Sequence, residues 1–304
     1  MSRPALVRTL RFAALLSLCT LAFGCPPGGI DTPEEAGAGD AAAVESAAAD
    51  RGPLLDGTEK SLVVVGYSTS YVWPAMLQDM LDDHAGGARI YHVLNAVIGG
   101  SPMGRWISPQ ESEDYQETYG AMLADFFGPD ARLRGDLPAP TVAIIQQSLQ
   151  RTPTPETRLG PVHDIDDPEG LRIGADALEK LSTQLRDDGI ERSYFGMHIY
   201  KEGYEPEIGN ERFALAALME RGHDFIFAGP DVWSPTFREH PEAFTEDRLH
   251  PNERGMRIMA DEWYRALAGA DARQEVIDAM YAREYDVEAM MREYFAWRSD
   301  EDGS

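Results

Sequence analysis

The chain has 304 residues, 43% of them hydrophobic, and its 27 Lys and Arg against 52 Asp and Glu give a formal net charge of −25. This length and composition can bury one sizeable core, whereas so acidic a surface repels nucleic acid and anionic membranes, so no nucleic-acid partner is expected. Both cysteines, Cys19 and Cys25, lie in the first 25 residues, which leaves the rest of the chain without a disulfide or a thiolate metal site.

The first 24 residues have the pattern of a targeting segment. Three arginines precede an apolar run at 12–23 that is too short to span a bilayer. The run leads into L-A-F-G-C, which resembles a bacterial lipoprotein box and implies lipidation of Cys25. We therefore expect a lipoprotein-type signal peptide over 1–24, membrane attachment through the lipid anchor only, and a location in the cell envelope, at the outer membrane or the periplasmic face. The alternative is an ordinary secretory signal and a secreted protein.

Residues 25–57 are predicted to be a disordered tether. From Pro26 to Pro53 the sequence is rich in Pro, Gly, Ala, Glu and Asp, with one Ile and one Val as its only large apolar residues. Such a composition cannot bury a core.

From Ser61 onward, short apolar runs alternate with amphipathic stretches, which is typical of βαβ units. The predicted strands are Leu62–Gly66, Ile90–Asn95, Thr141–Gln146, Ser193–Ile199 and Asp224–Phe227. The predicted helices are Trp73–His84, Gln110–Phe127, Glu169–Asp187, Asn210–Arg221 and Glu253–Leu267, the last capped by Asn252. This order predicts an α/β domain over 58–270, a flavodoxin-like three-layer α/β/α sandwich around a mainly parallel five-stranded sheet.

Residues 271–304 are predicted to form a C-terminal helical extension. Methionine and aromatic side chains recur at roughly helical spacing between 273 and 297, as expected for one or two helices that pack on the domain.

Two segments far apart in the chain carry the residues of a nucleophilic site. Ser68 follows an apolar run, at the C-terminal end of a predicted buried strand, where open α/β sheets place their sites. Asp247 and His250 form a D-x-x-H pair, in which the carboxylate can accept from Nδ1–H and leave Nε2 as a base. Together they indicate a serine hydrolase with Ser68 as nucleophile. A helix cap or turn at Ser68 and a loop ion pair at Asp247 and His250 are the structural alternatives.

Both segments resemble the SGNH (GDSL-like) hydrolase family, whose first block is a G-D-S-type turn and whose last is D-x-x-H-P. The last block here, from Asp247 to Tyr264, matches closely and includes Gly255, and the resemblance covers roughly residues 61–267. The first block departs, because Tyr67 stands where the family has Asp. The resemblance implies the SGNH hydrolase fold and a catalytic triad of Ser68, Asp247 and His250.

The resemblance also implies donors for an oxyanion hole. The Ser68 backbone N–H is the first, and a glycine after the second strand is the second, with Gly100 preferred and Gly99 as the alternative. The family's G-x-N-D block supplies an Asn that this chain lacks, since the third strand leads into Q-Q-S-L-Q. Some related carbohydrate esterases carry a Gln at this strand end, which matches Gln147, whereas a direct overlay places Gln150 there. Either amide can donate the required N–H.

No cofactor and no metal site are predicted. The sequence has neither G-x-G-x-x-G nor G-x-x-x-x-G-K-[ST]. One cluster hints at a cation, His163 with Asp164, Asp166 and Asp167, and is interpreted as a solvated acidic loop.

The preferred function is a serine esterase that hydrolyses small acyl esters, acetyl among them, through an acyl-Ser68 intermediate, with acylated carbohydrates as candidate substrates. Trp73, Trp106 and Trp233 are candidates to line an acyl or sugar pocket. The alternatives are an acyltransferase that acts on a polysaccharide and a non-catalytic envelope lipoprotein that binds glycan.

Overall fold

The computed structural model describes residues 53–107, 109–110, 112–147, 168–196, 199, 211–233 and 238–299. The expectations for the signal peptide, Cys25, the His163 cluster and Gln150 lie outside these residues. Residues 41–304 form one compact unit, and the fold below is that of its described part.

The core of the unit is a five-stranded sheet in which every pair of neighbouring strands is parallel. Its strands are β1 (Lys60–Gly66), β2 (Tyr91–Asn95), β3 (Pro140–Gln146), β4 (Arg192–Phe195) and β5 (Ile226–Ala228). Their order, β2-β1-β3-β4-β5, is that of flavodoxin-like sheets. All five strands were predicted, although β4 ends at Phe195 rather than at Ile199.

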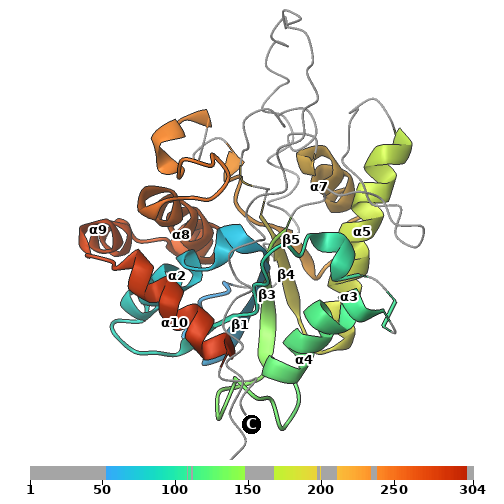
Figure 1. Ribbon diagram of the computed structural model, residues 1–304, viewed down its shortest axis with the longest axis horizontal. Coiled ribbons are helices and arrows are strands. Elements are labelled where there is room, and N and C mark those ends of the chain that lie inside the picture. Colours follow the sequence, from blue (N-terminus) through green and yellow to red (C-terminus); the bar gives the residue numbers. More distant parts are fainter. Residues whose placement is uncertain are drawn as a thin grey trace, which may run out of the picture. The chain divides into compact units, whose positions relative to one another are not determined.

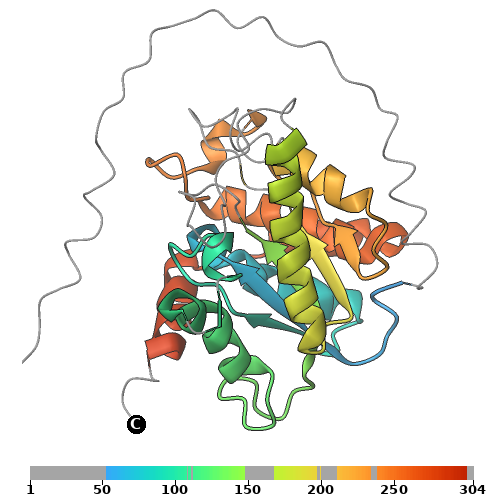
Figure 2. The same cartoon turned by 90° about the vertical axis from the view of Figure 1, so that its right-hand side faces the viewer.

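Helices cover both faces of this sheet (Figures 1 and 2). One layer contains α2 (Trp73–His84), α8 (Glu253–Ala268) and α9 (Gln274–Ala282), and the other contains α3 (Glu113–Tyr115), α4 (Ala121–Phe126), α5 (Pro168–Asp187) and α7 (Glu211–Met219). The predicted α/β/α sandwich is therefore confirmed. Among the described residues, no helix combines the length and apolarity that a membrane span requires.

Strand β1, which lies between β2 and β3, separates two hydrophobic cores. Leu62 and Val64 belong to the core beneath α2 and α8, whereas Val63 and Val65 belong to the core beneath α4 and α5. The split follows from the strand itself, because successive side chains point to opposite faces of a sheet. All four side chains are fully buried, and each contributes about 1.5–3 kcal/mol relative to an exposed position.

The packed body begins before the predicted domain boundary at residue 58. Leu54 and Leu55 are 5% and 7% exposed and belong to the core beneath α2. The Leu54 carbonyl also accepts a hydrogen bond of 2.8 Å from Lys60 Nζ. Leu54 and Leu55, which were predicted to belong to the tether over 25–57, are therefore part of the folded body.

The single helix predicted over Gln110–Phe127 is wrong in detail. A π-helical turn, η4 (Gln116–Gly120), separates α3 from α4. Within it, the Thr118 hydroxyl donates to the carbonyls of Asp114 and Arg105, 2.7 Å away in each case. A side chain that bonds to main-chain carbonyls competes with the regular helical ladder and accounts for the wider turn.

The C-terminal extension forms two helices, α9 and α10 (Val287–Ser299). Arg257 of α8 fastens the junction between them: its guanidinium donates to the carbonyls of Met280 and Arg283, at 2.5 and 2.7 Å, and lies 4.8 Å from the centroid of the Tyr285 ring. Farther along α10, the Trp297 ring lies 6.0 Å from that of Phe126 in α4. As Figures 1 and 2 show, α10 thus connects the α8–α9 side of the sheet with α4.

Candidate active site

Ser68 lies two residues after the end of β1, in a short 3-10 turn, η2 (Ser68–Ser70). Tyr67, which stands where the resemblance has Asp, is extended and 9% exposed, and its carbonyl accepts from the Ser70 N–H at 2.8 Å. Ser68 does not cap α2, because that helix begins at Trp73 without a side-chain cap. The nucleophile candidate therefore lies half-buried at the C-terminal edge of the sheet.

A line of hydrogen bonds joins Ser68 to the D-x-x-H segment. His250 Nε2 lies 2.8 Å from Ser68 Oγ, and His250 Nδ1 lies 2.6 Å from Asp247 Oδ2. Because an ionised carboxylate can only accept, Nδ1 carries the proton and Nε2 accepts from the Ser68 hydroxyl. The structure thus brings together all three residues that the sequence singled out.

The Asp247 carboxylate is held by more than His250. Its Oδ1 accepts from the Leu249 and His250 N–H groups at 2.9 and 3.0 Å and from Thr245 Oγ1 at 2.6 Å. Partial burial opposes ionisation, but the hydrogen bonds from His250, Thr245 and the two N–H groups outweigh it and hold the pKa of Asp247 well below its usual range. Asp247 is therefore a fixed negative charge behind the imidazole.

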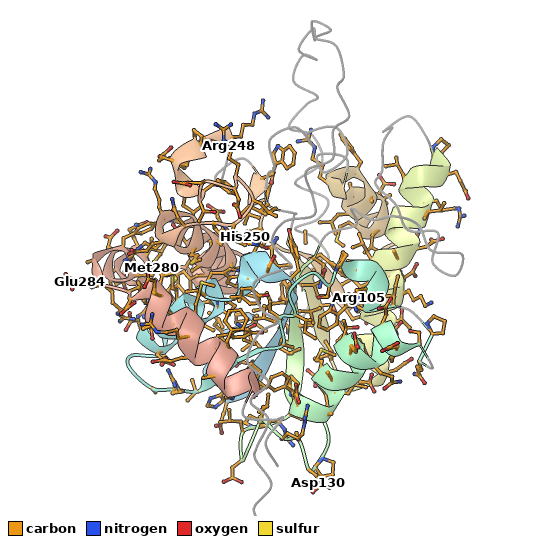
Figure 3. The ribbon with its side chains drawn as sticks, viewed as in Figure 1. Arg105, Asp130, Arg248, His250, Met280 and Glu284 are labelled. Carbon is orange, nitrogen blue, oxygen red and sulfur yellow. The ribbon has the colours of Figure 1, made fainter. Side chains whose placement is uncertain are left out.

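A closed loop places His250 over Ser68. Its two arms meet in an antiparallel bridge between Phe244 and Pro251, and the Thr245 N–H donates to the His250 carbonyl at 2.9 Å. Arg248, at the tip, has φ = 52° and is the one non-glycine among the described residues with a positive φ. Figure 3 shows His250 above the sheet and Arg248 farther out on this loop.

Asn252 and Gly255 fasten the loop to α8. The Asn252 side chain accepts from the N–H groups of Arg254 and Gly255, as predicted for the cap, and donates to the Phe244 carbonyl at 3.1 Å. At Gly255, an added Cβ would lie 2.3 Å from the Ala243 carbonyl oxygen and 2.8 Å from Pro251 Cβ. Only glycine permits this approach, so the start of α8 fixes the position of His250.

The segment that follows β2 places Gly99 beside Ser68. It continues along β1, because the Ile98 N–H donates to the Gly66 carbonyl at 3.2 Å. An added Cβ on Gly99 would lie 4.0 Å from Ser68 Cβ, whereas one on Gly100 would meet nothing within 4 Å. Gly100 instead has φ = 66°, a conformation that favours glycine. Of the two oxyanion candidates, Gly99 is the one with a close approach to Ser68.

The two glutamines at the end of β3 differ in their surroundings. Gln146 pairs with Gly66 of β1, and its Oε1 accepts from Trp263 Nε1 at 2.8 Å. Gln147 follows it at the same edge of the sheet as Ser68 and is 4% exposed, yet neither its amide nitrogen nor its amide oxygen has a hydrogen-bond partner among the described residues. A buried polar group without a partner costs about 1–3 kcal/mol, so the amide of Gln147 gains nothing for stability from the described residues around it.

The tryptophans considered as pocket residues are part of the interior. Trp73 and Trp106 have no exposed surface, and Trp233 is 6% exposed. Trp73 stacks on Trp263 with centroids 5.9 Å apart, and Trp106 Nε1 donates to the Ser101 carbonyl at 2.9 Å. That expectation is therefore wrong for Trp73 and Trp106. Each side chain packs in one of the two hydrophobic cores. A position near a loop in the sequence does not reveal such burial.

Sequence reasoning missed Thr245, whose hydroxyl holds Asp247, and Tyr71, whose hydroxyl lies 2.0 Å from the position of an added Cβ on Gly99. A hydroxyl residue two positions before the acid is a local signal that could have identified Thr245. Tyr71 has no comparable signal in the sequence, because only the three-dimensional fold brings its hydroxyl close to Gly99.

Among the described residues there is a further hollow but no cluster of potential metal ligands. No group of three or more His, Cys, Asp or Glu there could hold a metal ion. A hollow of about 690 Å³ lies at α8 and α9 and does not include the Ser68 site; it is lined by His240, Glu253, Arg254, Arg257, Ile258 and Tyr281. Its two arginines are engaged by Glu242 and Glu253.

No protein-family model and no curated protein matches this chain. Among solved structures, a gut microbial diltiazem-metabolizing enzyme matches 69% of this chain and 47% of its own length, with a TM-score of 0.41 and 11% identity. A lipase from a goat rumen metagenome matches 70% of this chain and all of its own length, with a TM-score of 0.41 and 10% identity. Likenesses this low say nothing of activity. The molecule is an α/β protein, and the candidate function depends on the site itself.

Proposed function

We propose that the protein is a serine esterase of the SGNH (GDSL-like) type, which hydrolyses small acyl esters through an acyl-Ser68 intermediate. The observation that carries the proposal is the pair of hydrogen bonds made by His250, 2.8 Å to Ser68 Oγ and 2.6 Å to Asp247 Oδ2. A nucleophile, a base within reach and a group that orients the base are the arrangement that acyl transfer requires.

In the first half-reaction, Ser68 Oγ attacks the ester carbonyl carbon as its proton passes to His250 Nε2. The tetrahedral intermediate then collapses: the bond to the alcohol oxygen breaks, and His250 returns the proton to the leaving alcohol. In the second half-reaction, a water molecule gives a proton to His250 and attacks the acyl carbon. The bond between the acyl carbon and Ser68 Oγ then breaks, and His250 returns the proton to the serine. Asp247 stays ionised throughout and stabilises the imidazolium.

The oxyanion of the intermediate needs preorganised donors. We assign this role to the Ser68 N–H, to a backbone N–H of the Gly99–Gly100 pair, and to the amide of Gln147. The assignment of Gln147 is supported by its buried amide, which has no hydrogen-bond partner among the described residues, and by its place next to Gln146, which pairs with Gly66 of β1. Gln150 remains the second candidate.

Substrate and location are proposed on the sequence alone. An acetyl or similarly small acyl group on a carbohydrate is the preferred substrate, and a lipid on Cys25 would hold the domain at the cell envelope. Transfer of the acyl group to a polysaccharide would use the same three residues and differ only in the acceptor.

The test is labelling of the full-length protein with a fluorophosphonate, followed by mapping of the modified residue. We expect a single label on Ser68 that is absent from Ser68→Ala and from heat-denatured protein, together with turnover of an aryl acetate. Absence of both label and turnover in the folded protein would leave the non-catalytic glycan-binding role.

A further inference from the structure

The C-terminal helix α10 reaches the surroundings of Ser68. The Tyr294 hydroxyl donates a hydrogen bond to the carbonyl of Val97, and the Tyr294 ring lies 5.1 Å from the ring of Tyr71. The neighbouring Phe295 ring lies 4.9 Å from the same Tyr71 ring. Val97 belongs to the segment after β2, and Tyr71 belongs to the segment after β1 that also contains Ser68.

These contacts fix one peptide unit from both sides. The Val97 carbonyl is held by the Tyr294 hydroxyl, and the N–H of the same peptide, that of Ile98, donates to the Gly66 carbonyl at 3.2 Å. The next carbonyl, that of Ile98, accepts from Ser101 Oγ at 2.5 Å. The chain is therefore anchored immediately before Gly99 and just after Gly100.

Tyr71 supplies a lateral contact to the same turn. Its hydroxyl lies so close to Gly99 that an added Cβ there would be 2.0 Å away, and its carbonyl accepts from Asn95 Nδ2 at 3.1 Å. The Tyr71 ring is in turn held by the rings of Tyr294 and Phe295. Helix α10 thus supports the Gly99–Gly100 pair directly through Val97 and indirectly through Tyr71.

Such support matters because two consecutive glycines impose little conformational restriction of their own. A backbone N–H stabilises a developing oxyanion only when its direction is set before the reaction. We propose that Tyr294 is a positioning residue for the turn of residues 97–100 and that α10, which follows the α/β sandwich in the chain, completes the active site. This inference deepens the proposed esterase function and rests on it.

The test is Tyr294→Phe, which retains the ring against Tyr71 and removes only the hydroxyl. Removal of a direct oxyanion donor costs roughly 10²–10³-fold in kcat, so loss of a group that positions one should cost about tenfold. KM for an aryl acetate and the melting temperature should change little. The inhibition constant of a small alkyl boronic acid, whose adduct on Ser68 places an oxygen at the oxyanion position, should rise by the same factor as kcat falls.

Tyr281→Phe is the matched control, because Tyr281 is a 44% exposed tyrosine of the neighbouring helix α9 and lines the hollow at α8 and α9 instead. It should leave kcat and the boronic acid constant unchanged. All rates are expressed per Ser68 labelled by fluorophosphonate. A Tyr294→Phe protein with wild-type kcat per labelled site would overturn the inference while the esterase proposal stands. Failure of wild-type protein to label would instead remove the proposed function itself.

Discussion

Gly255 and Ala243 approach each other so closely that a single methyl group between them would lie 2.3 Å from the Ala243 carbonyl oxygen. Gly255 is in the first turn of α8, and Ala243 ends the short helical turn η6 (Pro241–Ala243) that leads into the loop of His250. The Asn252 N–H donates to the same Ala243 carbonyl at 2.9 Å. The distance between these two residues thus sets how the base approaches Ser68.

We expect Gly255→Ala to force the loop away from α8 and to weaken both folding and turnover. Overpacking of this kind costs about 1–3 kcal/mol, measured here as a lower free energy of unfolding in urea. The matched control is Gly128→Ala, where an added Cβ meets only the Asp130 nitrogen, at 4.0 Å. Equal stability and activity of the two variants would show that the loop adapts.

Substitutions in the three site residues should have graded effects on turnover of an aryl acetate. Ser68→Ala and His250→Ala should abolish it, because each removes a group that forms or transfers a bond. Asp247→Asn should leave a residual rate, roughly 10⁴-fold below wild type, because it disturbs the imidazole tautomer without removing the base. Circular dichroism would check that all three variants remain folded. Full activity of Ser68→Ala would refute the mechanism.

Gln147→Ala should lower kcat by roughly 10²–10³-fold, or about 2.7–4 kcal/mol, with KM little changed, because an oxyanion donor acts on charge that exists only in the transition state. Gln147→Leu should be as slow but at least as stable as wild type, since it removes a buried amide to which no residue in the described part of the chain is hydrogen-bonded.

Gln146→Leu is the contrasting variant, because it deprives Trp263 Nε1 of its acceptor and should lose about 1–3 kcal/mol of stability. Gln150→Ala tests the second candidate for the same role. Near-normal kcat in both Gln147→Ala and Gln150→Ala would mean that backbone N–H groups alone bind the oxyanion.

Truncation should locate the start of the folded body between Pro53 and Gly57. A chain beginning at Pro53 should be folded and active, whereas one beginning at Gly57 lacks Leu54 and Leu55, which are buried in the core. Each lost leucine should cost about 1.5–3 kcal/mol, visible as a lower melting temperature. Identical melting temperatures for the two chains would show that these leucines contribute nothing.

Lipidation is tested separately, by metabolic labelling of full-length protein with a palmitate analogue. The label should appear on wild type and be absent from Cys25→Ala, since Cys25 is the cysteine of the segment that resembles a lipoprotein box. Persistence of label in Cys25→Ala would refute the anchor.

The strands and the site residues could be predicted because their signals are local. An apolar run such as Leu62–Gly66 marks a buried parallel strand by itself, and D-x-x-H holds the acid and the base within four residues. The π-helical turn could not be predicted, because one of the two carbonyls that Thr118 binds, that of Arg105, comes from a separate segment. The contact of Tyr294 could not be predicted either. In the sequence Tyr294 is one member of an apolar stripe, and only the fold places it beside Val97, 197 residues earlier in the chain.

The hydrogen bond between His250 and Ser68 spans 182 residues, and that has a consequence for biosynthesis. A ribosome completes the serine long before the histidine exists, and α10 is made later still. Pairings this remote in sequence also form slowly, because the loop that they close is long. A partly made chain therefore carries Ser68 without His250, and the hydrogen bond between them can form only after the chain has been synthesised past residue 250 and has folded.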